Sequence, residues 1–111
     1  MTHKTESDSI RDLNDVFRTS LKGGAVMLTA GIIALGGEAQ AKILTAVQTF
    51  DAFDVGNDPW GEHDFGSFEI DGQRIFFKLD YYDLTRAMHS EDPTDPSKTE
   101  RVMTIMLASE Y

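Results

Sequence analysis

The chain has no cysteine, and this absence excludes disulfide scaffolds, cysteine zinc sites and thiol nucleophiles. Long apolar runs are absent too. The most apolar stretch, residues 25–35, is interrupted by Gly31 and falls far short of the roughly 20 residues that cross a bilayer. Residues 1–20 are largely polar and do not resemble a signal peptide. We therefore expect a soluble, cytoplasmic protein.

Basic residues are scarce as well: 10 Lys and Arg stand against 19 Asp and Glu, for a net charge of −9. The whole imbalance lies in residues 51–95, where twelve acids face only Arg74, Lys78 and Arg86. Such a charge repels phosphate backbones, so we expect no direct nucleic-acid binding. It would attract a basic protein surface. Acidic loops also serve simply to keep proteins soluble, and that alternative stays open.

A chain of 111 residues with 41% hydrophobic content predicts one domain, residues 1–111, with residues 1–6 as a disordered tail. Ser7, Asp8 or Ser9 can cap a first helix that runs to about Thr19. Its apolar stripe is Ile10, Leu13, Phe17 and Leu21. Its polar side is Arg11, Asp12, Asp15 and Arg18.

Glycine pairs at residues 23–24 and 36–37 bound the next two elements. Residues 25–33 are apolar and favour a strand. Residues 38–50 favour a helix with Ile43, Val47 and Phe50 on one face. Residues 51–64 read as a loop, because Gly56-Asn57-Asp58-Pro59 is a typical turn sequence.

A β-hairpin is the clearest local signal. Residues 65–70 and 74–82 alternate in polarity around Asp71-Gly72, a pair that suits a type I′ turn. Residues 84–100 read as a loop and residues 101–107 as a last strand. The predicted fold is α+β: a small, mostly antiparallel sheet of about four strands with two helices packed on one face.

Glu62-His63-Asp64, with Asp54 and Asp58 upstream, is the best candidate for chemistry. Carboxylates and histidine are suitable metal ligands, and a carboxylate beside a histidine can orient a general base. The spacing matches no established metal motif, however, and an extended backbone would point His63 away from its neighbours. In the alternative, Asp58 and Asp64 cap turns and His63 hydrogen-bonds the hairpin.

Exposed aromatics within a charged rim are typical of protein interfaces, and Trp60 and Phe76 are candidates for that role. Trp60 could equally fold over the edge of the core. Asp80 could form ion pairs with Lys78 or Arg74 on an exposed sheet face. The candidate partner-binding residues are Asp54, Asp58, Trp60, Glu62, Asp64, Asp80 and Asp83.

Several segments together resemble a known family. They are LNDVFR (13–18), VMLTAG (26–31), FDAF (50–53), NDPWGEHDFG (57–66), KLDYYD (78–83) and TIMLASEY (104–111). The chain is similar to the bacterial domain-of-unknown-function family 3768, which is typical of alphaproteobacteria, their plasmids and their phages. The resemblance implies an accessory role of a mobile element: counter-defence, plasmid maintenance or regulation.

Two functions are therefore expected. The first is a non-enzymatic, acidic protein-interaction module without metal or cofactor, which binds a partner with a basic surface. In its most concrete form it inhibits a host nucleic-acid-binding defence complex, such as a CRISPR effector or a restriction enzyme, with carboxylates in the places of phosphates. The alternative is a small metal-dependent hydrolase or nuclease that uses Glu62, His63 and Asp64.

Overall fold

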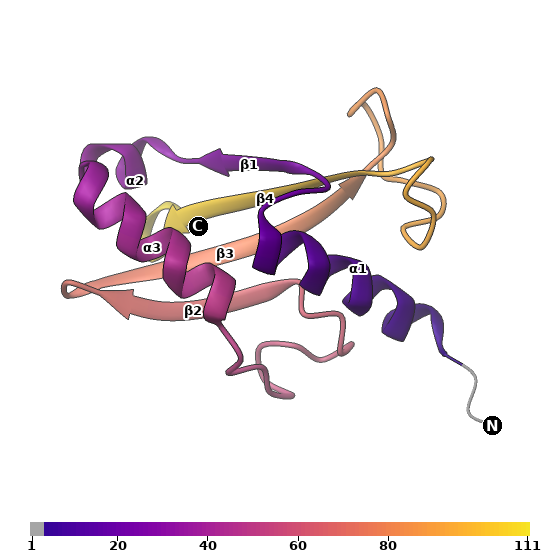
Figure 1. Cartoon of the computed structure of the whole chain (residues 1–111), viewed down its shortest axis with the longest axis horizontal. Helices are drawn as coiled ribbons and strands as arrows, with labels where there is room; N and C mark the ends of the chain where they lie inside the picture. Colours follow the sequence, from indigo (N-terminus) through magenta and orange to yellow (C-terminus); the bar gives the residue numbers. More distant parts are fainter. Residues whose placement is uncertain (1–3) are drawn as a thin grey trace.

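The computed structural model describes residues 4–111 and contains one four-stranded sheet. Its elements are α1 (Glu6–Ser20), β1 (Ala25–Leu28), α2 (Ala30–Ala34), α3 (Gly37–Thr49), β2 (Phe65–Ile70), β3 (Gln73–Tyr82), β4 (Glu100–Leu107) and a closing 3-10 turn, η1 (Ala108–Glu110). The strand order is β1-β4-β3-β2. β1 pairs with β4 in parallel, whereas β2 with β3 and β3 with β4 pair antiparallel. The predicted α+β fold with a mostly antiparallel sheet is confirmed, and α1 and α3 lie against one face (Figure 1).

The hairpin forms as the sequence predicts. Asp71 and Gly72 have φ angles of 50° and 81°, the left-handed geometry of a type I′ turn, which brings Gln73 opposite Ile70. Along β3, buried residues alternate with half-exposed ones because successive side chains point to opposite faces. The buried set is Ile75, Phe77, Leu79 and Tyr81.

The core lies between the sheet and the helices. Phe77 and Leu79 belong to the same buried cluster as Ile43 and Val47 of α3 and Phe17 of α1. These helical residues recur at the spacing that keeps them on one side of each helix. Burying this stripe against the sheet is what holds α1 and α3 in place.

The first helix begins earlier than predicted. Thr5 is its N-cap: the Thr5 hydroxyl accepts from the backbone N–H of Asp8, and the Asp8 carboxylate accepts from that of Thr5. This capping box satisfies two N–H groups that the helix leaves unpaired. Glu6, placed in the predicted tail, is therefore the first helical residue. Residues 1–3 of that tail lie outside the described residues.

The strand predicted over residues 25–33 is wrong in its second half. β1 ends at Leu28, and residues 30–34 form α2. The cause lies at the other end of the chain: the Glu110 carboxylate accepts from the Thr29 hydroxyl at 2.7 Å and from the Gly31 N–H at 3.0 Å. A side chain at Gly31 would collide with Glu110 and Leu107, so this close approach needs glycine.

Leu79→Ala tests the position of the core. Leu79 is buried between the sheet and the helices, so its truncation should lower the free energy of unfolding by about 2–5 kcal/mol in urea denaturation. Lys78→Ala is the matched control. Lys78 points to the opposite face, where it pairs with Asp80, and should cost less than about 1 kcal/mol. Equal losses for the two variants would contradict the assigned faces.

Candidate functional site

The loop that connects α3 to β2, residues 51–64, contains most of the predicted site residues; we call it the acidic loop. It is braced from within. Asp54 and Asn57 each accept a backbone N–H from the other, at 2.9 and 3.1 Å. Asp58, which is only 8% exposed, accepts from the backbone N–H of His63. These bonds give the loop a defined shape although it contains no helix or strand.

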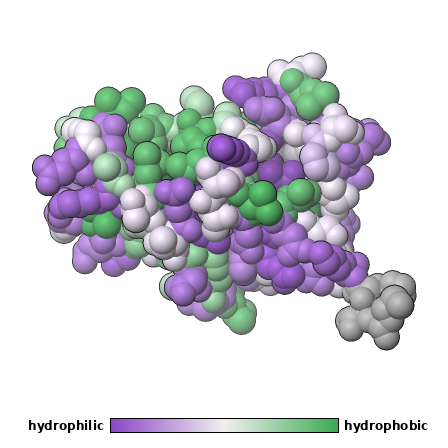
Figure 2. Space-filling model, in the orientation of Figure 1, coloured by the Kyte–Doolittle hydropathy of each residue, from purple (hydrophilic) through white to green (hydrophobic). Residues whose placement is uncertain are grey.

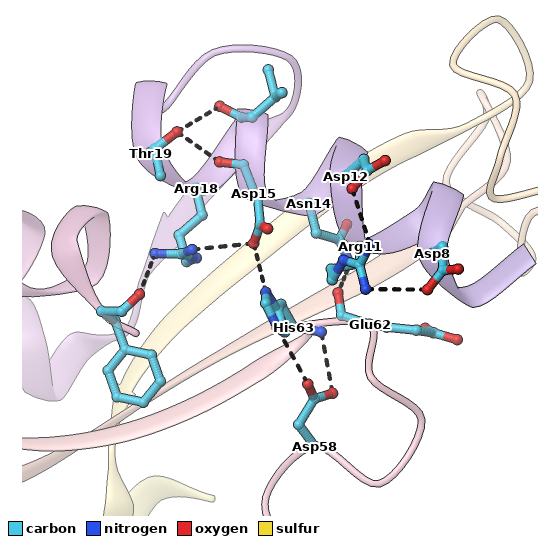
Figure 3. Close-up of polar contacts among 12 residues, drawn as sticks. Asp8, Arg11, Asp12, Asn14, Asp15, Arg18, Thr19, Asp58, Glu62 and His63 are labelled. Atoms are coloured by element: carbon cyan, nitrogen blue, oxygen red, sulfur yellow. Dashed lines mark hydrogen bonds and ion pairs between the residues drawn. The ribbon is translucent and has the colours of Figure 1, made fainter. Parts of the chain in front are cut away.

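His63 ties the acidic loop to α1. Its Nδ1 lies 2.9 Å from Oδ1 of Asp15, and its Nε2 lies 3.8 Å from Oδ2 of Asp58 (Figure 3). Its ring stacks on Phe53, with the ring centres 3.9 Å apart. The backbone of His63 is left-handed, with φ of 56°, which directs the imidazole towards the helix and away from a strand-like position. His63 therefore lies between a carboxylate of α1 and one of the loop.

Arg18 continues this contact to α3. Its guanidinium donates to Asp15 and to the carbonyl of Phe50 (Figure 3), and also to the carbonyl of Val47 in the last turn of α3. Helix ends leave carbonyls unpaired, and a cationic donor there satisfies them. The prediction that Arg18 lies on the polar side of the helix is wrong, because this side chain is buried. Asp15 thus joins Arg18 to His63.

Asn14 is a second residue of α1 that connects the helix to the acidic loop, and its side chain is fully buried. Its Nδ2 donates to the hydroxyl of Tyr81 at 2.8 Å and to the backbone carbonyl of Glu62 at 3.0 Å, while its Oδ1 accepts from Nε of Arg101 at 2.9 Å. The Tyr81 hydroxyl donates in turn to the Glu62 carboxylate. One amide therefore connects α1 to the acidic loop, β3 and β4.

Three carboxylates crowd the end of the acidic loop. Burial raises the pKa of Glu62 above its ordinary value; the Tyr81 hydroxyl partly opposes the rise, and Asp64 and Asp58 add to it. Burial also raises the pKa of Asp64, with further contributions from Asp58 and Asp80. Burial, and to a smaller extent this crowding, therefore opposes ionisation of both groups.

Trp60 does not fold over the core. It is 75% exposed, and Val55 in the same loop is 85% exposed. Phe76, the other aromatic candidate, lies half-buried on the opposite sheet face against Phe65 and Tyr111. The acidic loop thus projects apolar side chains from a braced backbone.

The predicted site residues are only partly brought together. Asp54, Asp58, Trp60, Glu62, His63 and Asp64 share the acidic loop. Asp80 pairs with Lys78 at 3.2 Å on the sheet face opposite to the one that α1 and α3 cover (Figure 1). Asp83 caps its own turn through Thr85 and Ala87, beside a hollow of about 450 Å³ that exposed Leu84 and Met88 also line.

The Glu62-His63-Asp64 run does not converge on one point. Glu62 binds Tyr81, His63 binds Asp15, and the Asp64 backbone accepts from Leu79. Across residues 4–111, no three His, Asp or Glu side chains are grouped so that they could hold a metal ion. These contacts instead hold the acidic loop in one conformation.

None of the described helices has the length and apolar character to cross a membrane.

Asn14, Asp15 and Arg18 were missed as site residues. A helical repeat offers a signal for two of them: Asn14 lies four residues after Ile10, and Arg18 lies four after Asn14, so both fall on the buried stripe. A polar residue in such a stripe must find partners inside the protein. Nothing local marks Asp15 as a contact of the acidic loop, because His63, its partner there, is 48 residues away.

Comparison with known families agrees with the resemblance seen in the sequence. The chain belongs to the family described as "Protein of unknown function (DUF3768)", whose sequence profile matches residues 28–110. Comparison with curated proteins and with solved structures finds no match. Asn14, Asp15 and Arg18 of α1 precede the matched segment, whereas the acidic loop, β3 and β4 lie within it.

Asn14→Ala tests the buried hydrogen bonds of the Asn14 amide. It leaves the Tyr81 hydroxyl and Nε of Arg101 without their buried partner, so the free energy of unfolding should fall by about 3 kcal/mol. Thr19→Ala, at an exposed site on the same helix, should change it by less than about 0.5 kcal/mol. Urea denaturation of the two variants measures both values. A near-neutral Asn14→Ala would contradict the role of this amide.

Asp64→Asn and Asp83→Asn should have opposite effects. The folded-state pKa of Asp64 is raised above 3.8, so its charge destabilises the fold and Asp64→Asn should be more stable than the wild type at neutral pH. Hydrogen bonds from Thr85 lower the pKa of Asp83, so its charge stabilises the fold and Asp83→Asn should be less stable.

Both differences should shrink as the pH falls. The Asp64→Asn gain disappears as the pH drops from the raised folded-state pKa to 3.8, and the Asp83→Asn loss disappears below 3.8. Thermal unfolding of the two variants and the wild type across acidic and neutral pH measures this. Differences of the same sign would show that the two carboxylates do not occupy contrasting environments.

Proposed function

We propose that this protein is a non-enzymatic interaction module that binds a basic protein surface through the acidic loop. The exposure of Trp60 carries the proposal. A tryptophan that is 75% exposed leaves a large apolar surface in water, and such side chains are the commonest energetic anchors of protein interfaces. Val55 enlarges the apolar surface of the same loop.

The bracing of the loop supports this role. A flexible loop loses conformational freedom when it binds, and that loss weakens the complex. The acidic loop loses much of this conformational freedom already when the protein folds, because His63 binds α1 and Asn14 binds the Glu62 carbonyl. It can therefore present Trp60 with little rearrangement.

Charge determines the kind of partner. Asp51 and Asp54 are exposed near the start of the loop, and Glu62 and Asp64 are half-buried at its end. Figure 2 shows hydrophilic side chains around this loop, with a small hydrophobic projection on the loop itself. Burial is the main cause of the raised pKa values of Glu62 and Asp64, and repulsion from neighbouring carboxylates adds to it. A partner rich in Lys and Arg would offset that repulsion, and its association would be steered by charge.

In its most concrete form, the partner is a nucleic-acid-binding defence complex met in the cytoplasm. The loop carboxylates then occupy phosphate positions, and the module inhibits by competition. The plasmid and phage setting implied by the family resemblance favours this form, and the net charge of −9 suits a phosphate mimic. The metal-dependent alternative has no grouped ligand set within residues 4–111 on which to build.

Trp60→Ala is the decisive variant. A partner would first be captured from cells that carry the protein, identified, and then purified for affinity measurements. Trp60→Ala should weaken binding at least about thirtyfold, as loss of an interface anchor does. Because Trp60 contacts little of the fold, its thermal unfolding should match that of the wild type.

Charge reversal tests the acidic side chains of the loop that surround Trp60. Their burial determines which of them can be reversed without disturbing the loop. Asp58 is buried and holds His63, so reversing it would disrupt the loop and not only its charge. Asp51→Lys, at an exposed site, should slow association mainly at low salt. Glu38→Lys makes the same charge change in the first turn of α3, far from the loop, and should leave the association rate unchanged. If Trp60→Ala and Asp51→Lys both keep full affinity, the acidic loop is not the binding surface.

A further inference from the structure

A second, chemically different site lies on the other side of α1. A small cleft of about 130 Å³ opens where the turn after α1 meets the segment that leads into β4. Its lining includes Leu13, Val16, Lys22, Pro96, Thr99 and Arg101. The acidic loop lies across α1 from this turn (Figure 1), so the cleft is separate from the surface proposed above.

Arg101 is the unusual member of this lining. It is 4% exposed, yet its side-chain contacts are neutral: the amide of Asn14, the carbonyl of Pro93 and the ring of Tyr81. Within residues 4–111 no carboxylate lies within ion-pairing distance of it, and its Nη1 has no hydrogen-bond partner. A buried cation normally has an anionic partner, because removing it from water is costly. Here the Glu62 carboxylate, which the Tyr81 hydroxyl binds, acts on Arg101 only from beyond ion-pairing distance.

Lys22 adds a second positive charge at the same cleft. Its side chain forms no ion pair with any residue in the described part of the chain. Of the ten Lys and Arg residues, Lys22, Arg74 and Arg101 are the three that form no ion pair within residues 4–111. Two bases without a carboxylate therefore border one cleft in an acidic protein, and such a concave cationic site attracts anions.

The rest of the lining indicates which anion fits. Leu13 and Val16 form an apolar wall, and Figure 2 shows hydrophobic side chains along this edge of α1. The Thr99 hydroxyl already donates to the Asp92 carbonyl, so the side-chain donors that the cleft offers an anion are those of Arg101 and Lys22. A carboxylate needs fewer partners, and an apolar group attached to it would contact the wall.

We propose that this cleft binds a carboxylate that carries a short, branched apolar group. The carboxylate lies against Arg101 and Lys22, and the apolar group lies against Leu13 and Val16. Two sources share this chemistry: a free branched-chain acid, and the C-terminus of a polypeptide that ends in an aliphatic residue. The volume of the cleft admits only the end of such a chain.

Nitrogen-15 NMR titrations of the full chain test the site with three probes: isovalerate, N-acetyl-leucine and N-acetyl-leucinamide. N-acetyl-leucine should give saturable shifts at the Gly23 and Thr99 amides and at the side-chain Nε–H of Arg101. N-acetyl-leucinamide, which lacks the charge, should bind at least about tenfold more weakly. Isovalerate binding as tightly as N-acetyl-leucine identifies a free acid as the fitting source; markedly weaker isovalerate binding identifies a chain end.

Two variants locate the site without disturbing the buried network around Arg101. Val16→Trp fills the cleft from an exposed position on α1 and should abolish the shifts. Lys22→Gln should weaken binding about two- to fivefold, whereas Lys42→Gln, the same change on α3, should not. Trp60→Ala should leave the shifts unchanged, which separates this site from the acidic loop. Absence of saturable shifts, equal binding of the amide, or full binding by Val16→Trp would overturn the proposal.

Discussion

The buried amide of Asn14 is the constraint on which the arrangement of this protein depends. It is a single side chain, yet its two donors and its acceptor reach the acidic loop, β3 and β4 from α1. Each partner would be costly to leave unpaired inside the protein. The helix can therefore not slide or rotate on the sheet without breaking several buried bonds together, whereas apolar packing alone would tolerate small shifts.

Arg18 reinforces this constraint one turn further along α1. It binds the carbonyls at the end of α3 and, through Asp15, holds His63. The acidic loop starts where α3 ends, so both ends of the loop are fixed to the same helix: its start through Arg18, and its last residues through Asn14 and His63. This explains how a loop without regular structure can hold an exposed tryptophan in a defined place.

Much of the acidic charge has a local structural role. Each of the following carboxylates accepts a backbone N–H within its own turn: Asp54, Asp58, Asp83, Asp92 and Asp95. Aspartate favours such turns because its short side chain reaches the backbone two to five residues on. A count of acids against bases therefore overestimates the carboxylates free to meet a partner.

The sequence predicts those parts of the fold that depend on neighbours along the chain. The hairpin follows from Asp71-Gly72 and the burial of β3 from strict alternation, and both are confirmed. The sequence does not predict α2, because the carboxylate that accepts the hydrogen bond of the Gly31 N–H belongs to Glu110, 79 residues away. The clamp between His63 and Asp15 is hidden for the same reason: two ordinary surface residue types become a site only once α1 lies beside the loop.

Helix α1 thus separates two surfaces of opposite character and supports both. On one side it fixes the acidic loop through Asn14 and Asp15; on the other it forms the wall of the cationic cleft through Leu13 and Val16. Arg101 reaches the cleft and is also held by Asn14, so the two surfaces share one buried support. A change at Asn14 would disturb both surfaces together and could not show which of them binds a ligand. Trp60 and Val16 each belong to one surface and point away from the shared network, so changes at these two positions can assign a binding event to one side of the helix.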